Sequence, residues 1–242
     1  MWRRARFVSR WARLGLAVLL AGGCAATPSP FGQQVQRIDE VALAGQELFS
    51  RGDMKRASRN FSRALSMSRS ADYPPGTAQQ LNNLGAVALE EEDYPQARDY
   101  FTQAYNLNQE HQQWAAASIN QANLATTAIK QGQPAAASQH LLTAQDAARQ
   151  SRSPQALGRV YLQWASFYLD QNDPGPAQDY LTRAQPLATT PELQGTLGYV
   201  CTARYWYPEQ WFTDFFDVLE RYQLLAATYG LQSTPVVPPL QY

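Results

Sequence analysis

Small and large apolar residues recur along most of the chain at intervals of 40 residues. The recurring sets are Ala57, Ala97, Ala137 and Ala177; Phe61, Phe101, Leu141 and Leu181; and Ala64, Ala104, Ala144 and Ala184. A fourth set, Gly45, Gly85, Ala125 and Ala165, precedes the first alanine of each copy by 12 residues. Positions at offsets 0, 4 and 7 share one face of a helix. Each copy therefore predicts a helix with a small, large, small stripe against which the preceding helix packs closely.

Turn-forming residues separate these apolar stretches. They are Gly52-Asp53, Glu92-Asp93-Tyr94-Pro95, Gly132-Gln133-Pro134 and Asn172-Asp173-Pro174. Proline fits the first turn of a helix and ends the helix before it. We predict helices over residues 36–51, 54–69, 76–92, 95–108, 112–131, 135–150, 155–171 and 176–188, with a further helix from Pro191.

The second copy resembles a tetratricopeptide repeat. The matching residues are the pair Leu84-Gly85, the turn residue Tyr94, and Ala97, Phe101 and Ala104. That family usually repeats every 34 residues, and the longer period here is similar to kinesin light chains and related peptide-binding proteins. The resemblance covers roughly residues 35–187. It implies an all-α fold, a right-handed superhelical solenoid of antiparallel helix pairs, with four pairs over residues 35–190 and a C-terminal capping helix.

The same resemblance implies a peptide-binding groove lined by the first helix of each pair. Its candidate residues are Asn82, Asn83, Asn123, Thr126, Arg159, Gln163 and Ser166, together with Lys130 and Asp170. Asn83, Asn123 and Gln163 form one column at 40-residue spacing, and in the long-period relatives an Asn there holds the backbone of an extended peptide. The alternative is a plain polar face in a Gln-rich protein. The Lys and Arg columns that bind a C-terminal carboxylate in other relatives are not filled.

The N-terminal segment has the order of an export signal. Residues 1–13 are basic, residues 14–21 are apolar, and two glycines and Cys24 follow. Leu20-Ala21-Gly22-Gly23-Cys24 resembles a bacterial lipoprotein signal, which implies removal of residues 1–23, acylation of Cys24 and a tether over residues 24–34. Ala25 after the cysteine favours an outer-membrane anchor facing the periplasm. The alternative is ordinary cleavage near Ala26 and a secreted protein.

After Pro191 the repeat pattern ends and aromatic residues gather. We predict capping helices over residues 191–230 and a Pro-rich extended tail over residues 231–242. An alternative role for this region is an interface for self-association, with Trp206, Trp211, Phe215, Phe216 and Tyr222 as candidates, because Trp and Tyr are enriched at binding hot spots. Self-association would make the protein a structural subunit of an envelope assembly.

Composition and motifs narrow the function. Without the five arginines of residues 1–13, 15 basic residues face 20 acidic ones, which gives no electrostatic reason to bind nucleic acid. No catalytic, metal-binding or phosphate-binding motif is present, so we predict no cofactor, no metal site and no catalytic residue. His111 and His140, the two histidines, are the weak candidates for an enzyme. The favoured function is an adaptor for an envelope or periplasmic protein or peptide.

Overall fold

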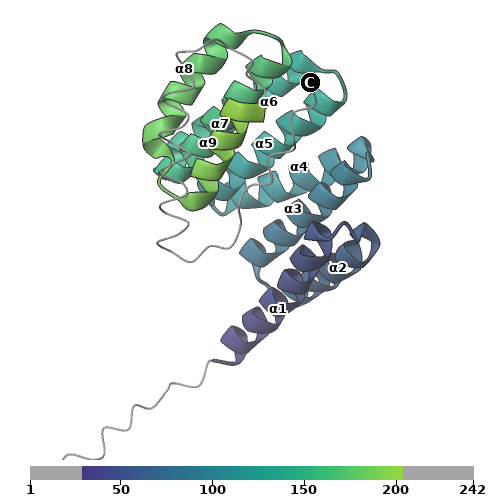
Figure 1. Ribbon diagram of the computed structural model, residues 1–242. Helices are drawn as coiled ribbons and strands as arrows, with labels where there is room; N and C mark the ends of the chain where they lie inside the picture. The colour runs from purple at the N-terminus through teal and green to yellow at the C-terminus, as the bar shows by residue number, and fades with distance from the viewer. Residues whose placement is uncertain (1–28, 204–242) are drawn as a thin grey trace, which may run out of the picture.

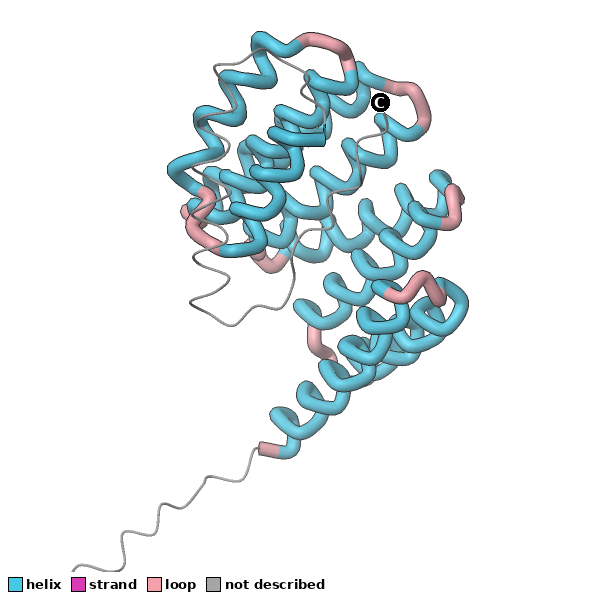
Figure 2. The backbone as a smooth tube through the Cα atoms, in the orientation of Figure 1, coloured by secondary structure: helices cyan, strands magenta, loops and turns pink. Residues whose placement is uncertain are grey.

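The computed structural model describes residues 29–203, and every regular element in them is a helix (Figures 1 and 2). The helices are α1 (Pro30–Ser50), α2 (Met54–Ser70), α3 (Pro74–Glu90), α4 (Tyr94–Glu110), α5 (Trp114–Lys130), α6 (Pro134–Ser151), α7 (Pro154–Asp170), α8 (Pro174–Ala184), the short 3₁₀-helix η1 (Gln185–Leu187) and α9 (Pro191–Ala203). The prediction of an all-α solenoid of helix pairs is confirmed.

The helices stack in chain order, from α1 at one end to α7, α8 and α9 at the other (Figure 1). Each helix from α1 to α7 packs on the next one, and each odd-numbered helix from α1 to α7 also contacts the following odd-numbered helix. Helices α2, α4 and α6 each pack chiefly on their own partner and on the odd-numbered helix that follows, and α8 packs on α7. The odd-numbered helices therefore form the inner layer of the solenoid, and α2, α4, α6 and α8 form the outer layer.

The 40-residue repeat contains a shorter 20-residue repeat of helix starts. Helices α2 to α8 begin at positions 54, 74, 94, 114, 134, 154 and 174. The residue two positions before each of these starts has a positive φ; these residues are Gly52, Asp72, Glu92, Gln112, Gly132, Arg152 and Asn172. Because L-residues pay a steric cost in this left-handed region, only the two glycines adopt it freely.

Hydrogen bonds across these links explain why the non-glycine residues keep a positive φ despite its steric cost. In every link except the one before α7, the N–H of the last link residue donates to the carbonyl five residues earlier, as Asp93 does to Ala88 at 2.8 Å and Gln113 to Asn108 at 2.7 Å. This is the Schellman pattern that satisfies the last carbonyls of a helix. The Asp93 side chain then accepts from the N–H of Gln96 at 3.1 Å and caps α4. One short link thus ends a helix and starts the next.

The recurring apolar columns form the core. The eight column alanines on the outer helices are all 0% exposed, and Phe61, Phe101, Leu141 and Leu181 are at most 3% exposed. In the first two copies a ring covers a glycine, so closely that a Cβ on Gly85 would lie 2.6 Å from Cε1 of Phe101. In the last two copies the fully buried Ala125 and Ala165 replace the glycine.

Two predicted boundaries were wrong. The tether predicted over residues 24–34 is helical from Pro30, because Ser29 accepts a hydrogen bond from the N–H of Gly32 at 3.0 Å and Pro30 occupies the first helical position. Helix α8 ends at Ala184 instead of residue 188, because Pro186 lacks the N–H that would continue the ladder. The chain tightens there into η1.

Candidate protein-binding surface

Seven predicted groove residues lie on the inner layer. Asn82 and Asn83 are on α3, Asn123 and Thr126 on α5, and Arg159, Gln163 and Ser166 on α7. All seven are half-buried. We call this set the inner face. Its side chains are accessible, but neighbouring helices hold them in place.

Four asparagines from three helices form a continuous hydrogen-bond network across the inner face. Asn108 of α4 donates to Asn120 of α5 at 2.7 Å, and Asn120 donates to Asn82 of α3 at 2.9 Å. Asn123 of α5 donates to the same oxygen of Asn82 at 2.8 Å. Asn108 and Asn120 are buried at 5% and 2% exposure. The two buried amides hold the half-buried side chains of Asn82 and Asn123 in defined orientations through these hydrogen bonds.

Asn83 has a different partner from its neighbour in sequence. Its Nδ2 donates to Oε1 of Gln80 one turn earlier at 3.1 Å, within α3. Gln80 is fully buried, and its own Nε2 has no hydrogen-bond partner among the described residues. Asn83 and Asn123 occupy equivalent positions in two repeats, yet only Asn123 is tied to an adjacent repeat.

The last two repeats are linked by other groups. Gln163 of α7 donates through Nε2 to the hydroxyl of Thr126 on α5 at 2.9 Å. Arg159 of α7 forms an ion pair with Glu192 at the start of α9, 3.0 Å apart, and the two side chains are 41% and 68% exposed. An exposed pair contributes little to stability, so Arg159 can exchange Glu192 for an acidic ligand at low cost.

Several amide atoms at the surface remain available. Among the described residues, Nδ2 of Asn82, Oδ1 of Asn83, Oδ1 of Asn123 and Oε1 of Gln163 take part in no hydrogen bond. Each of these side chains has one end held by the protein and the other end unused. A peptide backbone presents one donor and one acceptor per residue, and a fixed row of amides can match both.

The sequence analysis missed Asn108 and Asn120, although the chain contains a signal for them. Gln80, Asn120 and Val160 form one 40-residue column, and Ser68, Asn108 and Ala148 form another. All six residues are buried. A polar residue in a column that is apolar in another copy indicates a buried hydrogen bond, because an unpaired buried amide is costly.

The two histidines lie in different surroundings. His140 on α6 contacts Oε1 of Gln121 on α5 through Nδ1 at 2.8 Å. Burial lowers the pKa of His140, and the nearby charge of Arg98 lowers it further. His111 is exposed at the C-terminal end of α4. Within residues 29–203, no group of three or more His, Cys, Asp or Glu side chains is arranged to hold a metal ion.

Several predicted sites lie outside the described residues. They are the lipidation candidate Cys24 and the self-association candidates Trp206, Trp211, Phe215, Phe216 and Tyr222. Between residues 29 and 203, none of the helices combines the length and the apolar character needed to cross a membrane.

Sequence comparison supports the repeat assignment. Residues 41–110, which include the C-terminal half of α1 and all of α2, α3 and α4, match the family model for the tetratricopeptide repeat. A search of curated proteins found no match.

Structural comparison extends the likeness to the rest of the solenoid. The apo form of RapI aligns with a TM-score of 0.60 at 13% identity, over 81% of this chain and 70% of RapI. BtubC (BKLC) from P. vanneervenii gives 0.51 at 13% identity, over 88% and 98% of the two chains. A putative kinesin light chain from Podospora anserina, with nearly identical TPR-like repeats, gives 0.52 at 11% identity, over 80% and 96%. The fold is thus a tetratricopeptide-type superhelix.

Proposed function

We propose that this protein is a lipid-anchored adaptor of the bacterial cell envelope, which binds a segment of an envelope or periplasmic protein on its inner face. The observation that carries the proposal is the four-asparagine network. It holds Asn82 and Asn123 in fixed positions while one end of each amide stays unused. Preorganised side chains bind with a smaller loss of entropy than free ones.

An extended peptide is the ligand that suits this arrangement. The unused atoms on α3, α5 and α7 include one N–H donor, on Asn82, and carbonyl acceptors on Asn83, Asn123 and Gln163. Such groups recognise a backbone and not a particular side chain. Arg159 at the α7 end adds a positive charge, which favours a ligand with an acidic residue near that end.

The envelope location rests on the N-terminal sequence. The basic segment, apolar run and Cys24 are arranged as in a lipoprotein signal, and Ala25 favours the outer membrane. Acylation of Cys24 would attach the solenoid to the membrane, since more than one acyl chain on a cysteine anchors a protein stably. Mass spectrometry of the protein from cells tests this part alone, because it reports whether the N-terminal residue is an acylated Cys24.

In-cell photo-cross-linking tests the adaptor function. A photoreactive residue would replace Gln79, which is exposed on α3 in the same 40-residue column as Arg159. A matched probe would replace Gln103, exposed on the outer helix α4. We expect one envelope protein to be captured from position 79 and not from position 103, and mass spectrometry identifies it.

A pair of double variants completes the test. Asn83→Ala with Asn123→Ala removes inner-face amides, whereas Gln103→Ala with Gln139→Ala removes two exposed amides from the outer helices α4 and α6. Only the first pair should reduce capture at position 79, while helical content stays unchanged in both. Equal capture by both variants would contradict the inner-face proposal. Cross-links confined to this chain between residues 206 and 229 would favour the self-associating subunit instead.

A further inference from the structure

Helix α2 carries an unusual concentration of positive charge. Between Met54 and Ser70 it contains Lys55, Arg56, Arg59, Arg63 and Arg69 and no acidic residue. Each other helix in residues 29–203 contains at most one Lys or Arg. The solenoid as a whole has more acidic than basic residues, so this local excess runs against its net charge.

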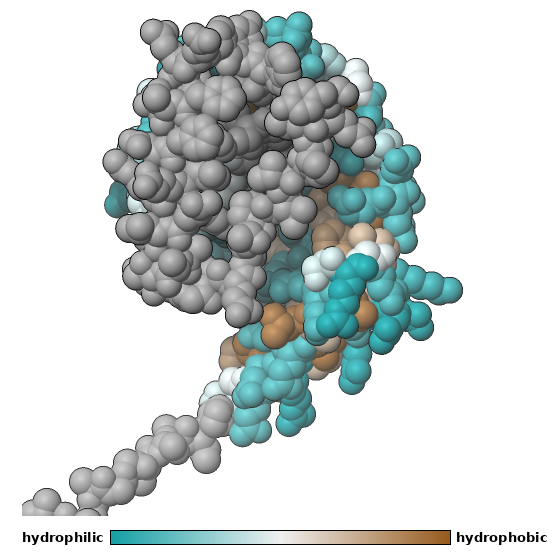
Figure 3. All heavy atoms as spheres, viewed as in Figure 1, coloured by the Kyte–Doolittle hydropathy of each residue, from teal (hydrophilic) through white to brown (hydrophobic). Residues whose placement is uncertain are grey.

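The exposed side chains of α2 form one stripe along its outer surface. The stripe consists of Lys55, Arg59, Ser62, Arg63, Ser66, Arg69 and Ser70, all exposed, while Ala57, Phe61, Ala64, Leu65 and Ser68 face the core. We call the first set the basic stripe. At 1.5 Å per residue it is about 24 Å long. Figure 3 shows hydrophilic side chains over the lower part of the stack, where Figure 1 places α1 and α2.

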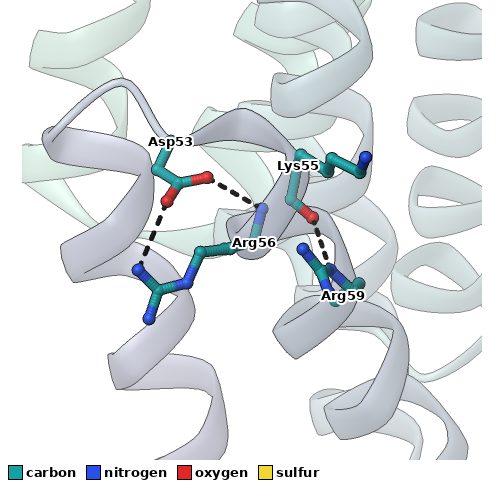
Figure 4. Close-up of polar contacts among 4 residues, drawn as sticks. All are labelled: Asp53, Lys55, Arg56 and Arg59. Carbon is teal, nitrogen blue, oxygen red and sulfur yellow. Dashed lines mark hydrogen bonds and ion pairs between the residues drawn. The ribbon is translucent and has the colours of Figure 1, made fainter.

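Most of these charges have no counter-charge in the solenoid. Arg56 turns back to Asp53 at the start of the helix, with 3.5 Å between Nη1 and Oδ2, as Figure 4 shows. Arg59 lies along the helix and donates from Nε to the carbonyl of Lys55 at 3.3 Å, while the ammonium of Lys55 points away (Figure 4). In residues 29–203, Lys55, Arg59, Arg63 and Arg69 form no ion pair.

This arrangement destabilises the isolated helix. Lys55, Arg59 and Arg63 are spaced four residues apart, where like charges repel each other. Lys55 also lies in the first turn, where the helix dipole disfavours a cation. No ion pair in residues 29–203 offsets this repulsion, so the four cations are available to an external anion.

The position of the basic stripe suggests which anion this is. Tyr73, just after α2, packs edge-on against Phe31 in the first turn of α1, with ring centroids 6.0 Å apart. The Arg69 end of the stripe therefore lies beside the start of α1. Pro30 follows Cys24 by six residues, a span of at most about 21 Å. A bilayer that holds an acylated Cys24 is thus within reach of the stripe.

We propose that the basic stripe of α2 binds anionic phospholipid headgroups of the leaflet in which the lipid anchor is inserted. Arginine guanidinium groups donate paired hydrogen bonds to phosphate, and the serines between them add hydroxyl donors. The inference rests on the proposed lipid anchor for its geometry. Since α2 belongs to the outer layer, this contact leaves the inner face directed away from the membrane and open to a partner.

Vesicle binding tests the proposal on residues 24–242 with Cys24→Ser, which cannot be acylated and lacks the basic and apolar segment of residues 1–21. The probes are vesicles of phosphatidylcholine alone and vesicles with added phosphatidylglycerol. We expect binding only to the second kind, weakening as salt rises. Arg59→Gln, Arg63→Gln and Arg69→Gln together should weaken it about 100-fold, since each cation near an anionic surface contributes a factor of about five.

A matched variant separates the stripe from net charge. Arg98→Gln, Arg149→Gln and Arg183→Gln remove the same charge from exposed positions on the other outer helices α4, α6 and α8. This variant should bind within about threefold of the parent, because its substitutions lie outside the stripe. An equal loss in both variants, or equal binding to neutral vesicles, would overturn the proposal. Circular dichroism verifies that both variants keep their helices.

The two lysines of the chain provide an internal control. Lys55 lies in the basic stripe, and Lys130 lies at the end of α5, also exposed. Amine acetylation in the presence of phosphatidylglycerol vesicles should slow at Lys55 and not at Lys130. Equal rates at both lysines would exclude contact through α2. This result does not depend on acylation of Cys24, so it separates the stripe from the proposed anchor.

Discussion

The first two repeats and the last two build the same helix contact from different residues. In the first two, a phenylalanine of the outer helix covers a glycine of the inner helix, as Phe61 does with Gly45 and Phe101 with Gly85. In the last two, Leu141 and Leu181 occupy the ring positions, and Ala125 and Ala165 replace the glycines. A phenylalanine over a glycine, which has no side chain, fills a volume similar to that of a leucine over an alanine. The backbone is therefore maintained by the sum of two side chains, as expected for a close-packed core.

The junctions between repeats differ in a second way. Where the second repeat meets the third, Asn108 and Asn120 form a buried hydrogen bond. The equivalent residues between the third and fourth repeats are Ala148 and Val160. Both junctions are buried, so the repeat tolerates either polar or apolar filling, provided that both sides change together.

The largest expected effect tests the ring contact. Phe101→Ala should lower the free energy of unfolding by about 3–5 kcal/mol, because the cavity faces Gly85, which has no side chain to fill it. Leu141→Ala should cost less, about 2–4 kcal/mol, because it removes a smaller side chain. Urea denaturation followed by circular dichroism measures both. If Leu141→Ala lowers the free energy of unfolding more than Phe101→Ala does, the Leu–Ala and Phe–Gly pairings do not fill equivalent volumes.

A double-mutant cycle examines the same pairing directly. Gly85→Ala should destabilise the protein by about 1–3 kcal/mol, since its Cβ would meet the ring of Phe101. Combined with Phe101→Leu, it reproduces the pairing of the third repeat, and most of that loss should be recovered. The control Gly195→Ala has no atom within 4 Å of the added Cβ. Additive effects in the cycle would contradict a direct contact between positions 85 and 101.

The polar junction can be exchanged for the apolar one. Asn120→Val alone should cost about 1–3 kcal/mol, because it leaves Asn108 buried without its acceptor. Adding Asn108→Ala, to match Ala148 and Val160, should recover most of this loss. Thermal melting of the single and double variants gives the comparison. If the double variant is less stable than the single one, the network stabilises the fold through more than this pair.

The links between helices allow a smaller test of backbone strain. Gly132 has φ of +69° with nothing within 4 Å of an added Cβ, so Gly132→Ala should cost about 1 kcal/mol through backbone conformation alone. Glu92 has φ of +60° in the equivalent link, and Glu92→Gly should stabilise by a similar amount. Urea midpoints should shift in opposite directions. Shifts of the same sign would mean that side-chain contacts of Glu92 outweigh its backbone strain.

The smallest effect concerns pH. Burial, reinforced by Arg98, lowers the pKa of His140. The unfolded chain therefore takes up its proton at a higher pH than the folded chain, so stability falls as the pH drops through the ordinary His range, near 6.5. His140→Gln should reduce this fall, and His111→Gln, at an exposed position, should not. Melting temperatures of the parent and the two variants between about pH 8 and pH 5 measure this loss of stability. An identical pH dependence in both variants would exclude His140 as the cause.

The repeat and its core could be predicted from the chain alone. Columns such as Ala57, Ala97 and Ala137 have a constant spacing, and helical geometry converts that spacing directly into a buried stripe. The bounds of the predicted helices differ from those of α2 to α7 by no more than two residues at either end. The start of α1 was missed because Pro30 has the residue type of a linker and acts here as the first residue of a helix.

The sequence predicted which residues lie on the inner face, but not which hydrogen bonds they form. Asn82 meets Asn120 and Asn123, which lie 38 and 41 residues away, on either side of the 40-residue period. Those offsets depend on how far each inner helix slides and rotates against the next. The sequence by itself therefore determined the helices, their order and the apolar core, since these follow from local periodicity. Only the tertiary structure decided which amides bond to one another and which ends stay unused, because hydrogen bonds between helices depend on displacements of a few ångströms that no spacing encodes.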